Sequence, residues 1–301
     1  MKPEIFSNIQ RILGKPFCEG ENYLIYNCDC LEAMLALPDD VVNLTVTSPP
    51  YNIGKDYEKV LPLDAYLDWC ELWMSQVYRV TDQDGGFCLN LGYLSIPEKG
   101  KAVPLPYLLW ERTKFFLLQE IVWNYGAGVA GKKFLSPRNE KISWYVKNES
   151  SYTFNLDDIR DPDVKYPNQK KNGKLRCNTI GKNPSDVWQI AKVTSGENRS
   201  SRERAPHPAQ FPRDLIDRII KGFSNVGELI LDPFIGSGTT AESAIMLERS
   251  VIGFEVNTSY CSYIAERLHS AECALKTGRK EIRDNAKTRV SNDAQVPILF
   301  T

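Results

Sequence analysis

Segments with the composition of β-strands alternate with helical patterns along most of this chain, and that alternation constrains the fold more than any other feature. Apolar runs rich in β-branched and aromatic residues, typical of strands, lie at residues 23–27, 41–47, 86–91, 117–123, 142–147, 229–231 and 251–254. Apolar residues with helical spacing lie at residues 64–80, 213–222, 239–248 and 259–275. Strands that alternate with helices predict an α/β fold, with a largely parallel sheet covered by helices on both faces.

Residues 148–206 interrupt this rhythm, because they are polar and punctuated by Asp-Pro, Tyr-Pro, Asn-Gly and Asn-Pro pairs. We interpret them as an insertion, which divides the chain into residues 1–147, 148–205 and 206–275 and a polar tail, 276–301, that we expect to be frayed. Within residues 164–206, ten basic against three acidic residues give a local charge of +7. From charge alone, a solvated loop is the favoured interpretation.

Composition limits the classes of protein to consider. The 301 residues carry a net charge of −1, so a nucleic-acid surface requires local segregation of charge. No apolar run approaches the ~20 residues that span a bilayer, and the N-terminus lacks a secretory signal, so we expect no membrane role and a cytoplasmic protein with reduced cysteines. Cys28 and Cys30 form a close pair without a second pair or a His cluster, so we expect no metal site.

A proline-rich run, Thr-Ser-Pro-Pro-Tyr-Asn at residues 47–52, directly follows the predicted strand at 41–47. Ligand sites of open α/β sheets lie at the carboxyl ends of strands, so the position itself indicates a site. Pro49 and Pro50 lack N–H donors and fix the backbone, so their carbonyls form a rigid surface of acceptors. Ser48 adds a hydroxyl that can also accept, and Tyr51 supplies a flat face for stacking.

Such an acceptor surface suits an aromatic ring that carries an amino group. Ser48 Oγ and the Pro49 carbonyl can bind both amino hydrogens and hold the nitrogen toward a methyl donor. The nitrogen lone pair is conjugated into the ring, and these hydrogen bonds favour a more pyramidal and more reactive geometry. An ordinary turn that closes a strand explains a Pro-Pro pair equally well, but the whole hexapeptide after a strand is more specific.

A second motif, Asp-Pro-Phe-Ile-Gly-Ser-Gly-Thr-Thr at residues 232–240, separates a predicted strand from a predicted helix. Gly236 and Gly238 let the backbone turn sharply and approach a ligand, and the N–H groups of the helix start can hold an anionic group. Glu255 follows at the end of the next predicted strand, where a carboxylate can accept both ribose hydroxyls of a nucleoside cofactor. Alone, this pattern also fits a dinucleotide-binding oxidoreductase, which gives no reason for the Ser-Pro-Pro-Tyr run.

Together the two motifs resemble the catalytic and cofactor motifs of the amino-methylating DNA methyltransferases, in the beta-class order with the catalytic motif first. Residues 120–126, 183–188 and 207–212 also resemble segments of that family, so the likeness covers most of the chain. It implies a Rossmann-like class I methyltransferase sheet in circularly permuted order. It also implies S-adenosylmethionine as cofactor and double-stranded DNA as substrate.

Carried over by residue, the resemblance implies a group that binds a flipped base, made of Ser48, Pro49, Pro50 and Tyr51. Phe234, Gly236 and Gly238 would line the methionine of the cofactor. Glu255 would bind its ribose and Asp29 its adenine, although a helix N-cap explains Asp29 nearly as well. The full expected cofactor site is Asp29, Asp232, Pro233, Phe234, Gly236, Ser237, Gly238, Thr239, Glu255 and Asn257.

The resemblance also places the target-recognition region in the irregular insertion, which turns the basic segment from a solvated loop into an expected DNA contact surface. The residues expected to contact DNA are Lys170, Lys171, Lys174 and Arg176. The resemblance allows a cognate restriction endonuclease as a further partner, and either a monomer or a homodimer.

The remaining candidate residues refine the chemistry. Methylation at carbon 5 of cytosine needs a Cys nucleophile, generally after a proline, and no cysteine here follows a proline, so that chemistry is excluded. Ser48 favours N4 of cytosine over N6 of adenine, because adenine enzymes of the family usually carry Asp there. A non-catalytic DNA-binding protein with the same fold is a further alternative. We interpret His207 as a loop anchor, with a place near the cofactor as second choice, and Trp110, Trp123 and Trp144 as core residues.

Overall fold

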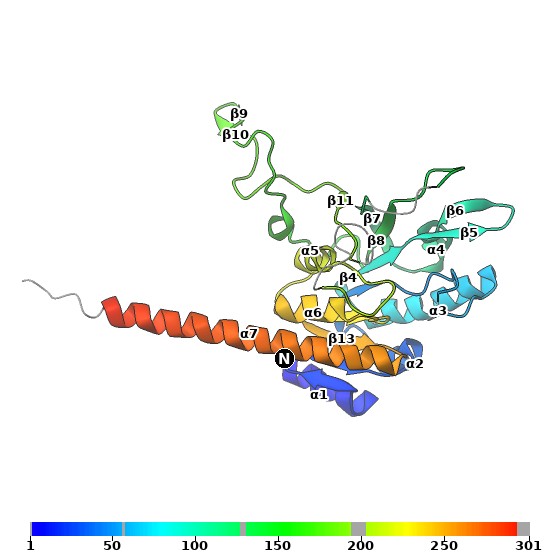
Figure 1. Ribbon diagram of the computed structural model, residues 1–301, viewed down its shortest axis with the longest axis horizontal. Coiled ribbons are helices and arrows are strands. Elements are labelled where there is room, and N and C mark those ends of the chain that lie inside the picture. Colours follow the sequence, from blue (N-terminus) through cyan, green and yellow to red (C-terminus); the bar gives the residue numbers. More distant parts are fainter. Residues whose placement is uncertain (1, 56–57, 127–130, 194–202, 294–301) are drawn as a thin grey trace, which may run out of the picture.

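The predicted strands pair into one nine-stranded sheet, in the order β1-β2-β13-β12-β3-β4-β8-β7-β11 (Figure 1). This arrangement comes from a computed structural model that describes residues 2–55, 58–126, 131–193 and 203–293. The strands of this sheet are β1 (Cys18–Gly20), β2 (Tyr23–Tyr26), β3 (Val42–Thr47), β4 (Thr81–Leu91), β7 (Phe116–Asn124), β8 (Asn139–Val146), β11 (Val187–Gln189), β12 (Leu229–Asp232) and β13 (Ser250–Phe254). Among them, β1 and β8 run antiparallel to their neighbours and the other pairs are parallel. The prediction of a largely parallel α/β sheet is confirmed.

Helices cover both faces of this sheet, each over its own hydrophobic core. One face is covered by α1 (Lys2–Leu13), α2 (Cys30–Ala36), α3 (Leu63–Val80) and α4 (Leu105–Leu109), and the other by α5 (Arg213–Phe223), α6 (Thr239–Met246) and α7 (Thr258–Asp293). Because side chains alternate along a strand, Leu229 and Leu231 of β12 join the core under α3, and Ile230 joins the core under α5. The continuous apolar runs in the sequence reflect this burial on both faces.

The carboxyl ends of the parallel strands meet along one edge of the sheet, and both motifs begin there. β3 ends one residue before Ser48, and β12 ends at Asp232. These two strands are neighbours, with Leu231 opposite Thr45. The hydroxyl of Thr47 donates a hydrogen bond of 2.7 Å to the Asp232 carboxylate, across 185 residues of sequence. Sheet topology therefore brings the two motifs into contact.

The insertion is only partly irregular. Its basic segment forms a two-stranded hairpin of β9 (Lys170–Lys171) and β10 (Lys174–Leu175) that projects from the body (Figure 1). Beyond it, β11 belongs to the main sheet and pairs with β7 in parallel, with Trp188 buried beside the Arg218 guanidinium. The predicted insertion thus contributes an edge strand to the fold. Two of its counted basic residues, Arg199 and Arg202, lie outside the described residues.

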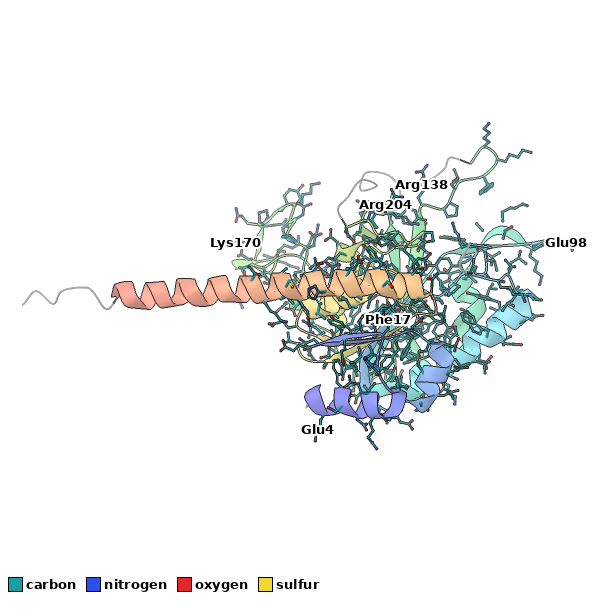
Figure 2. The ribbon with its side chains drawn as sticks, turned by 60° about the horizontal axis from the view of Figure 1, so that its bottom comes forward. Glu4, Phe17, Glu98, Arg138, Lys170 and Arg204 are labelled. Carbon is teal, nitrogen blue, oxygen red and sulfur yellow. The ribbon has the colours of Figure 1, made fainter. Side chains whose placement is uncertain are left out.

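Two expectations about single elements are wrong. The last helix, predicted to end at residue 275, continues to Asp293 as α7, which extends beyond the body in Figures 1 and 2. Trp110 is 62% exposed, because it lies in a short 3-10 helix (Trp110–Arg112) after α4 rather than on an apolar face. Trp123 and Trp144 are buried as expected, and Trp144 stacks on Phe223 with ring centroids 4.0 Å apart. Among the described residues, no helix is both long and apolar enough to cross a membrane.

Candidate active site

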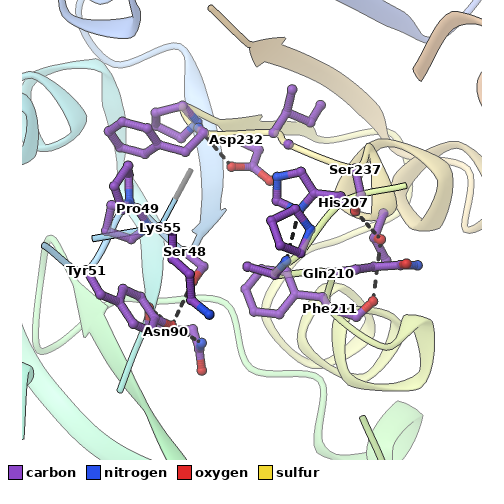
Figure 3. Close-up of a pocket in the computed structure, with 18 of the residues that line it drawn as sticks. Ser48, Pro49, Tyr51, Lys55, Asn90, His207, Gln210, Phe211, Asp232 and Ser237 are labelled. Carbon is purple, nitrogen blue, oxygen red and sulfur yellow. Dashed lines mark hydrogen bonds between the residues drawn. The ribbon is translucent and has the colours of Figure 1, made fainter. Parts of the chain in front are cut away.

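A cavity of about 790 Å³ lies at the carboxyl edge of the sheet and is lined by both motifs. Figure 3 shows Ser48, Tyr51 and Asn90 on one side of it, facing His207 and Ser237 on the other. Its volume is in the range of cavities that hold small molecules and cofactors. The two sides have different chemistry.

The Ser-Pro-Pro-Tyr side is held rigidly by hydrogen bonds from neighbouring elements. Tyr66 of α3 donates a hydrogen bond of 2.8 Å from its hydroxyl to the Pro50 carbonyl. Ser48 Oγ and the Tyr51 hydroxyl are 2.8 Å apart and share a hydrogen bond. Asn52, with a φ of 62°, exchanges two hydrogen bonds with the backbone of Leu61 and so anchors the loop that follows. Because the Pro50 carbonyl is already used, the acceptors available to a ligand here are Ser48 Oγ and the Pro49 carbonyl.

Asp232 is a buried carboxylate on the other side of the cavity. It accepts hydrogen bonds from the Thr47 hydroxyl and from the Phe234 amide, 3.1 Å away. Burial raises its pKa to about 6, because the charged form loses its hydration. No lysine or arginine among the described residues forms an ion pair with it. An ionised Asp232 therefore favours a cation in the cavity.

Glu255 is fixed by two backbone amides. The Gly236 amide donates to its Oε2 at 3.0 Å, and the Asn257 amide donates to its Oε1 at 2.8 Å. Burial raises the pKa of this carboxyl above its ordinary value. Each carboxylate oxygen keeps further acceptor capacity, which suits a pair of ribose hydroxyls.

Gly236 must be a glycine for two reasons. Its φ is +50°, which other residues rarely adopt, and an added Cβ would lie 3.0 Å from Nε2 of His207. Gly238 also has a positive φ, of +76°, but it does not line the cavity, and a Cβ there would meet Ile264 of α7. The second glycine of the motif therefore serves the packing of α6 against α7.

The other predicted cofactor residues line the cavity. Asp29 does so while it caps α2, accepting hydrogen bonds from the amides of Leu31 and Glu32 at 2.8 and 3.2 Å. Both interpretations of Asp29 are thus compatible with its position. The ring of Phe234 packs edge-on against Trp69 and Trp73, which fixes it as one wall. The lining residues from the predicted sets are Asp29, Ser48, Pro49, Pro50, Tyr51, Asp232, Pro233, Phe234, Gly236, Ser237, Thr239, Glu255 and Asn257.

Both interpretations of His207 are compatible with its position. Its Nδ1 accepts a hydrogen bond from the Ala209 amide at 3.2 Å, as a loop anchor does. Its ring also lines the cavity, packed edge-on against Tyr260 with centroids 4.7 Å apart. Burial lowers the pKa of His207 to about 4, so the ring is neutral at physiological pH.

A polar group on the Ser48 side of the cavity, made of Asn90, Glu140 and Lys192, was not predicted from the sequence. They come from the end of β4, from β8 and from the segment after β11, and all line the cavity. Glu140 and Lys192 form an ion pair at 2.7 Å, with side chains 14% and 21% exposed. Lys192 Nζ also lies 3.8 Å from the ring centroid of Tyr125. Of these three residues, only Asn90 carried a signal in the sequence, because it lies near the end of a predicted strand.

The four residues predicted to contact DNA do not line the cavity. Lys170, Lys171 and Lys174 lie on the strands of the β9–β10 hairpin and are exposed, and Arg176 follows it. Figure 2 shows Lys170 at one side of the molecule, well apart from Arg138 and Arg204. The structure therefore places this basic group on a projecting arm, separate from the site of chemistry.

The cavity fits a cationic nucleoside cofactor beside an amino-bearing ring. Its Asp232 side combines the buried Asp232 carboxylate and the half-buried Glu255 carboxylate with the aromatic wall of Phe234, which suits a sulfonium and an adenosyl group. Its Ser48 side offers hydrogen-bond acceptors and the Tyr51 ring. S-adenosylmethionine has the charge and the nucleoside that the first side requires.

Comparisons with known proteins agree with this geometry. A family model described as DNA methylase, N6_N4_Mtase, matches residues 42–266. The Type II methyltransferase M.ScaI of Streptomyces caespitosus is 54% identical over 269 residues, which cover 89% of this chain and 88% of that protein. The DNA adenine methyltransferase YhdJ of Escherichia coli (strain K12) is 30% identical over 283 residues, covering 89% and 92%. The solved PvuII DNA methyltransferase (cytosine-N4-specific) has a TM-score of 0.67 at 22% identity, covering 84% and 88%, a likeness of fold alone.

Proposed function

The chain belongs to the DNA methylase family that includes N6-adenine and N4-cytosine enzymes, and on that premise we propose that it methylates N4 of a flipped-out cytosine within a short DNA sequence. It is a DNA methyltransferase with a class I methyltransferase fold, and its cofactor is S-adenosylmethionine. The observation that carries the proposal is the cavity itself, in which Ser48 and Pro49 face the Asp232–Glu255 side. A base must leave the duplex to reach it.

The residues that line the cavity act by binding and orientation. S-adenosylmethionine supplies an electrophilic methyl group when bound. Ser48 Oγ and the Pro49 carbonyl accept the two amino hydrogens, which holds the nitrogen lone pair toward the Asp232 side. Tyr51 supports Ser48 through their shared hydrogen bond. Direct transfer to nitrogen forms no bond to the protein, and the resulting ammonium is acidic enough to lose its proton without a strong base.

The choice of cytosine rests on Ser48, which stands where adenine enzymes of the family usually carry Asp. The second candidate is N6 of adenine, which YhdJ, a DNA adenine methyltransferase, supports. A hydroxyl and a carboxylate both accept hydrogen bonds, so the amino-group chemistry is the same for either base.

We expect N4-methylcytosine as the product. Plasmid DNA methylated by the purified protein is digested to nucleosides, which are separated and identified by mass spectrometry. N4-methylcytosine and N6-methyladenine differ in mass and retention, so the result is unambiguous. N6-methyladenine as sole product would replace the first candidate by the second and leave the cofactor and the amino-group chemistry unchanged.

We further propose that the β9–β10 hairpin contacts DNA phosphates. Its cationic side chains, on Lys170, Lys171, Lys174 and Arg176, are exposed and lie on a projecting arm. The turn between the strands is Asn172-Gly173, with positive φ at both residues. An exposed cationic hairpin of this kind can follow a groove of the duplex while the base enters the cavity.

Replacing Lys170, Lys171, Lys174 and Arg176 together by Gln should weaken DNA binding and flatten its salt dependence. Each phosphate contact contributes ~0.9 to the slope of log affinity against log salt, so the slope should fall by about 3 to 4. Fluorescence anisotropy over a range of salt concentrations measures this. The control is the double variant Arg11→Gln and Lys15→Gln. Arg11 lies in α1 and Lys15 follows this helix, which lies on the opposite side of the body from the hairpin in Figure 1. This variant should leave the slope unchanged. An unaltered slope for the quadruple variant would contradict the proposed phosphate contacts and would favour the interpretation of these residues as a solvated surface hairpin.

We also propose a role in restriction and modification. M.ScaI is described as a Type II methyltransferase and covers most of this chain at 54% identity. A restriction endonuclease that cuts the same DNA sequence is the partner that such a role requires.

A further inference from the structure

A chain of hydrogen bonds runs from Ser48 to a half-buried carboxylate on β8, that of Glu140. Ser48 Oγ is 2.8 Å from the Tyr51 hydroxyl, which is 3.2 Å from Oε2 of Glu140. Asn90 Nδ2 donates to both the Tyr51 oxygen and Glu140 Oε2, at 2.7 Å each. Lys192 holds the other carboxylate oxygen at 2.7 Å. Glu140 has no role in the proposed binding of the base or of the cofactor.

The charges in this group decide which way its hydrogen bonds point. The Tyr51 hydroxyl has a single hydrogen, and an ionised carboxylate is a stronger acceptor than the Ser48 hydroxyl or the Asn90 carbonyl. Lys192 holds the Glu140 carboxylate in an ion pair, with 2.7 Å between Nζ and Oε1. The opposite orientation of the Asn90 amide would place Oδ1 against this carboxylate and repel it. The Tyr51 hydrogen therefore points to Glu140.

This direction fixes the hydrogen of Ser48 as well. The Tyr51 oxygen, having donated to Glu140, accepts hydrogen bonds from Asn90 Nδ2 and from the Ser48 hydroxyl. Ser48 then donates its only hydrogen to Tyr51. Both lone pairs of Ser48 Oγ can therefore accept hydrogen bonds from a ligand in the cavity. An amino group of a base meets a pure acceptor, whereas a Ser48 free to rotate would present a hydrogen to the amino hydrogens for part of the time.

We propose that Glu140 is a positioning residue that acts on Ser48 through Tyr51 and receives the proton released after methyl transfer. This inference rests on the proposed amino-group methylation. The N–H bond of the methylated ammonium breaks as Ser48 Oγ takes the proton. The Ser48 hydrogen passes to Tyr51, and the Tyr51 hydrogen passes to Glu140, which ends as a neutral carboxylic acid beside Lys192. The base then carries a neutral methylamino group, and Glu140 later loses the proton to water.

The test compares two replacements of Glu140 that separate charge from shape. Glu140→Gln keeps the shape and loses the charge, so Ser48 is no longer held as a pure acceptor, and the single-turnover methylation rate should fall by about ten- to a hundredfold through poorer orientation of the amino group. Glu140→Asp keeps the charge and should retain more of the rate than Gln. A merely structural role predicts the opposite order, since Gln fills the same space. A Gln variant within twofold of the wild type, or an Asp variant slower than Gln, would overturn the proposal.

A second comparison tests the route through Tyr51. In a Tyr51→Phe background the hydroxyl that links Ser48 to Glu140 is missing, so adding Glu140→Gln should change the rate by less than about twofold. Multiplicative effects of the two changes would contradict the route. Glu120→Gln is the matched control, because Glu120 forms a similar ion pair with Lys141 at 3.0 Å on β7 and β8 outside the cavity. It should leave the rate unchanged.

Two further readouts keep the outcomes distinct. The dissociation constant for S-adenosylmethionine should be the same in the wild type and in Glu140→Gln, since Glu140 lies on the Ser48 side of the cavity. A weakened affinity would assign Glu140 to the cofactor and overturn its role here. If the wild-type protein transfers no methyl group to DNA, the proposed function fails before any variant is compared. If adenine is the product, the assignment of Glu140 is unaffected.

Discussion

We expect Gly236→Asp to weaken the binding of S-adenosylmethionine at least a hundredfold. The residue has a φ of +50°, and a Cβ there would lie 3.0 Å from His207 Nε2, so the loop must move. That movement breaks the hydrogen bond from its amide to Glu255 and brings a second negative charge against that carboxylate. If Glu255 then no longer accepts the two ribose hydroxyls of the cofactor, the loss of these two charge-assisted hydrogen bonds costs about 3 kcal/mol or more, which corresponds to at least a hundredfold increase in Kd.

Isothermal titration calorimetry with S-adenosylmethionine measures this effect. Phe234→Ala should also weaken binding strongly, because it removes the aromatic wall that Trp69 and Trp73 hold in place. Gly14→Asp is the matched control, since Gly14 has a φ of +79° with nothing within 4 Å of an added Cβ, so it imposes similar backbone strain away from the cavity. Unchanged Kd values for both Gly236→Asp and Phe234→Ala would contradict the proposal that the cofactor binds on this side of the cavity.

Asp232→Asn should weaken cofactor binding while it stabilises the protein at neutral pH. Asn keeps an acceptor for the Thr47 hydroxyl and the Phe234 amide but carries no charge. The folded wild type binds the Asp232 proton with a pKa of about 6, against an ordinary value of 3.8. The wild type therefore loses stability as pH rises between these two values, by about 3 kcal/mol in all, and the Asn variant does not. Affinity for a cationic cofactor should fall about tenfold or more, because a buried carboxylate is lost.

Two measurements check this pair of effects. Urea unfolding without cofactor should show the Asn variant more stable than the wild type at pH 7.5, with the difference shrinking at pH 4, where both side chains are neutral. Titration calorimetry at pH 7.5 should show the weaker binding. A stability difference that is independent of pH, or an undiminished affinity, would contradict the assignment of Asp232 as the counter-charge of the cofactor.

The cavity-lining residues that lie in a single strand-to-loop junction could be predicted from the local sequence. Ser48 and Gly236 could be identified because each follows a short buried strand and because prolines and glycines restrict the backbone in ways that the residue names reveal. The parallel sheet followed from the alternation of strands and helices. Gly238 shows the limit of this approach, since it belongs to the same motif as Gly236 but packs against Ile264 and not against the cavity.

The Glu140 group could not be predicted, because its members meet only through the topology of the sheet. β8 enters between β4 and β7 in the antiparallel sense, and this places Glu140 beside Asn90, 50 residues earlier in the chain. Lys192 reaches the same point from the segment after the edge strand β11. Glu and Lys are ordinary surface residues in a sequence, and only their burial together marks them. The projecting hairpin was likewise recognisable as basic, but not as separate from the cavity.

The most direct test of the central claim is methylation of DNA in a host that expresses the wild-type protein, with Ser48→Ala as the comparison. Sequencing that detects modified bases should find one short motif methylated at an amino group throughout the genome in the wild-type host. The Ser48→Ala host should show that motif largely unmethylated, because the acceptor for the amino hydrogens is gone. A genome without amino methylation, from a host that contains folded protein able to bind S-adenosylmethionine, would contradict the claim that this cavity methylates DNA.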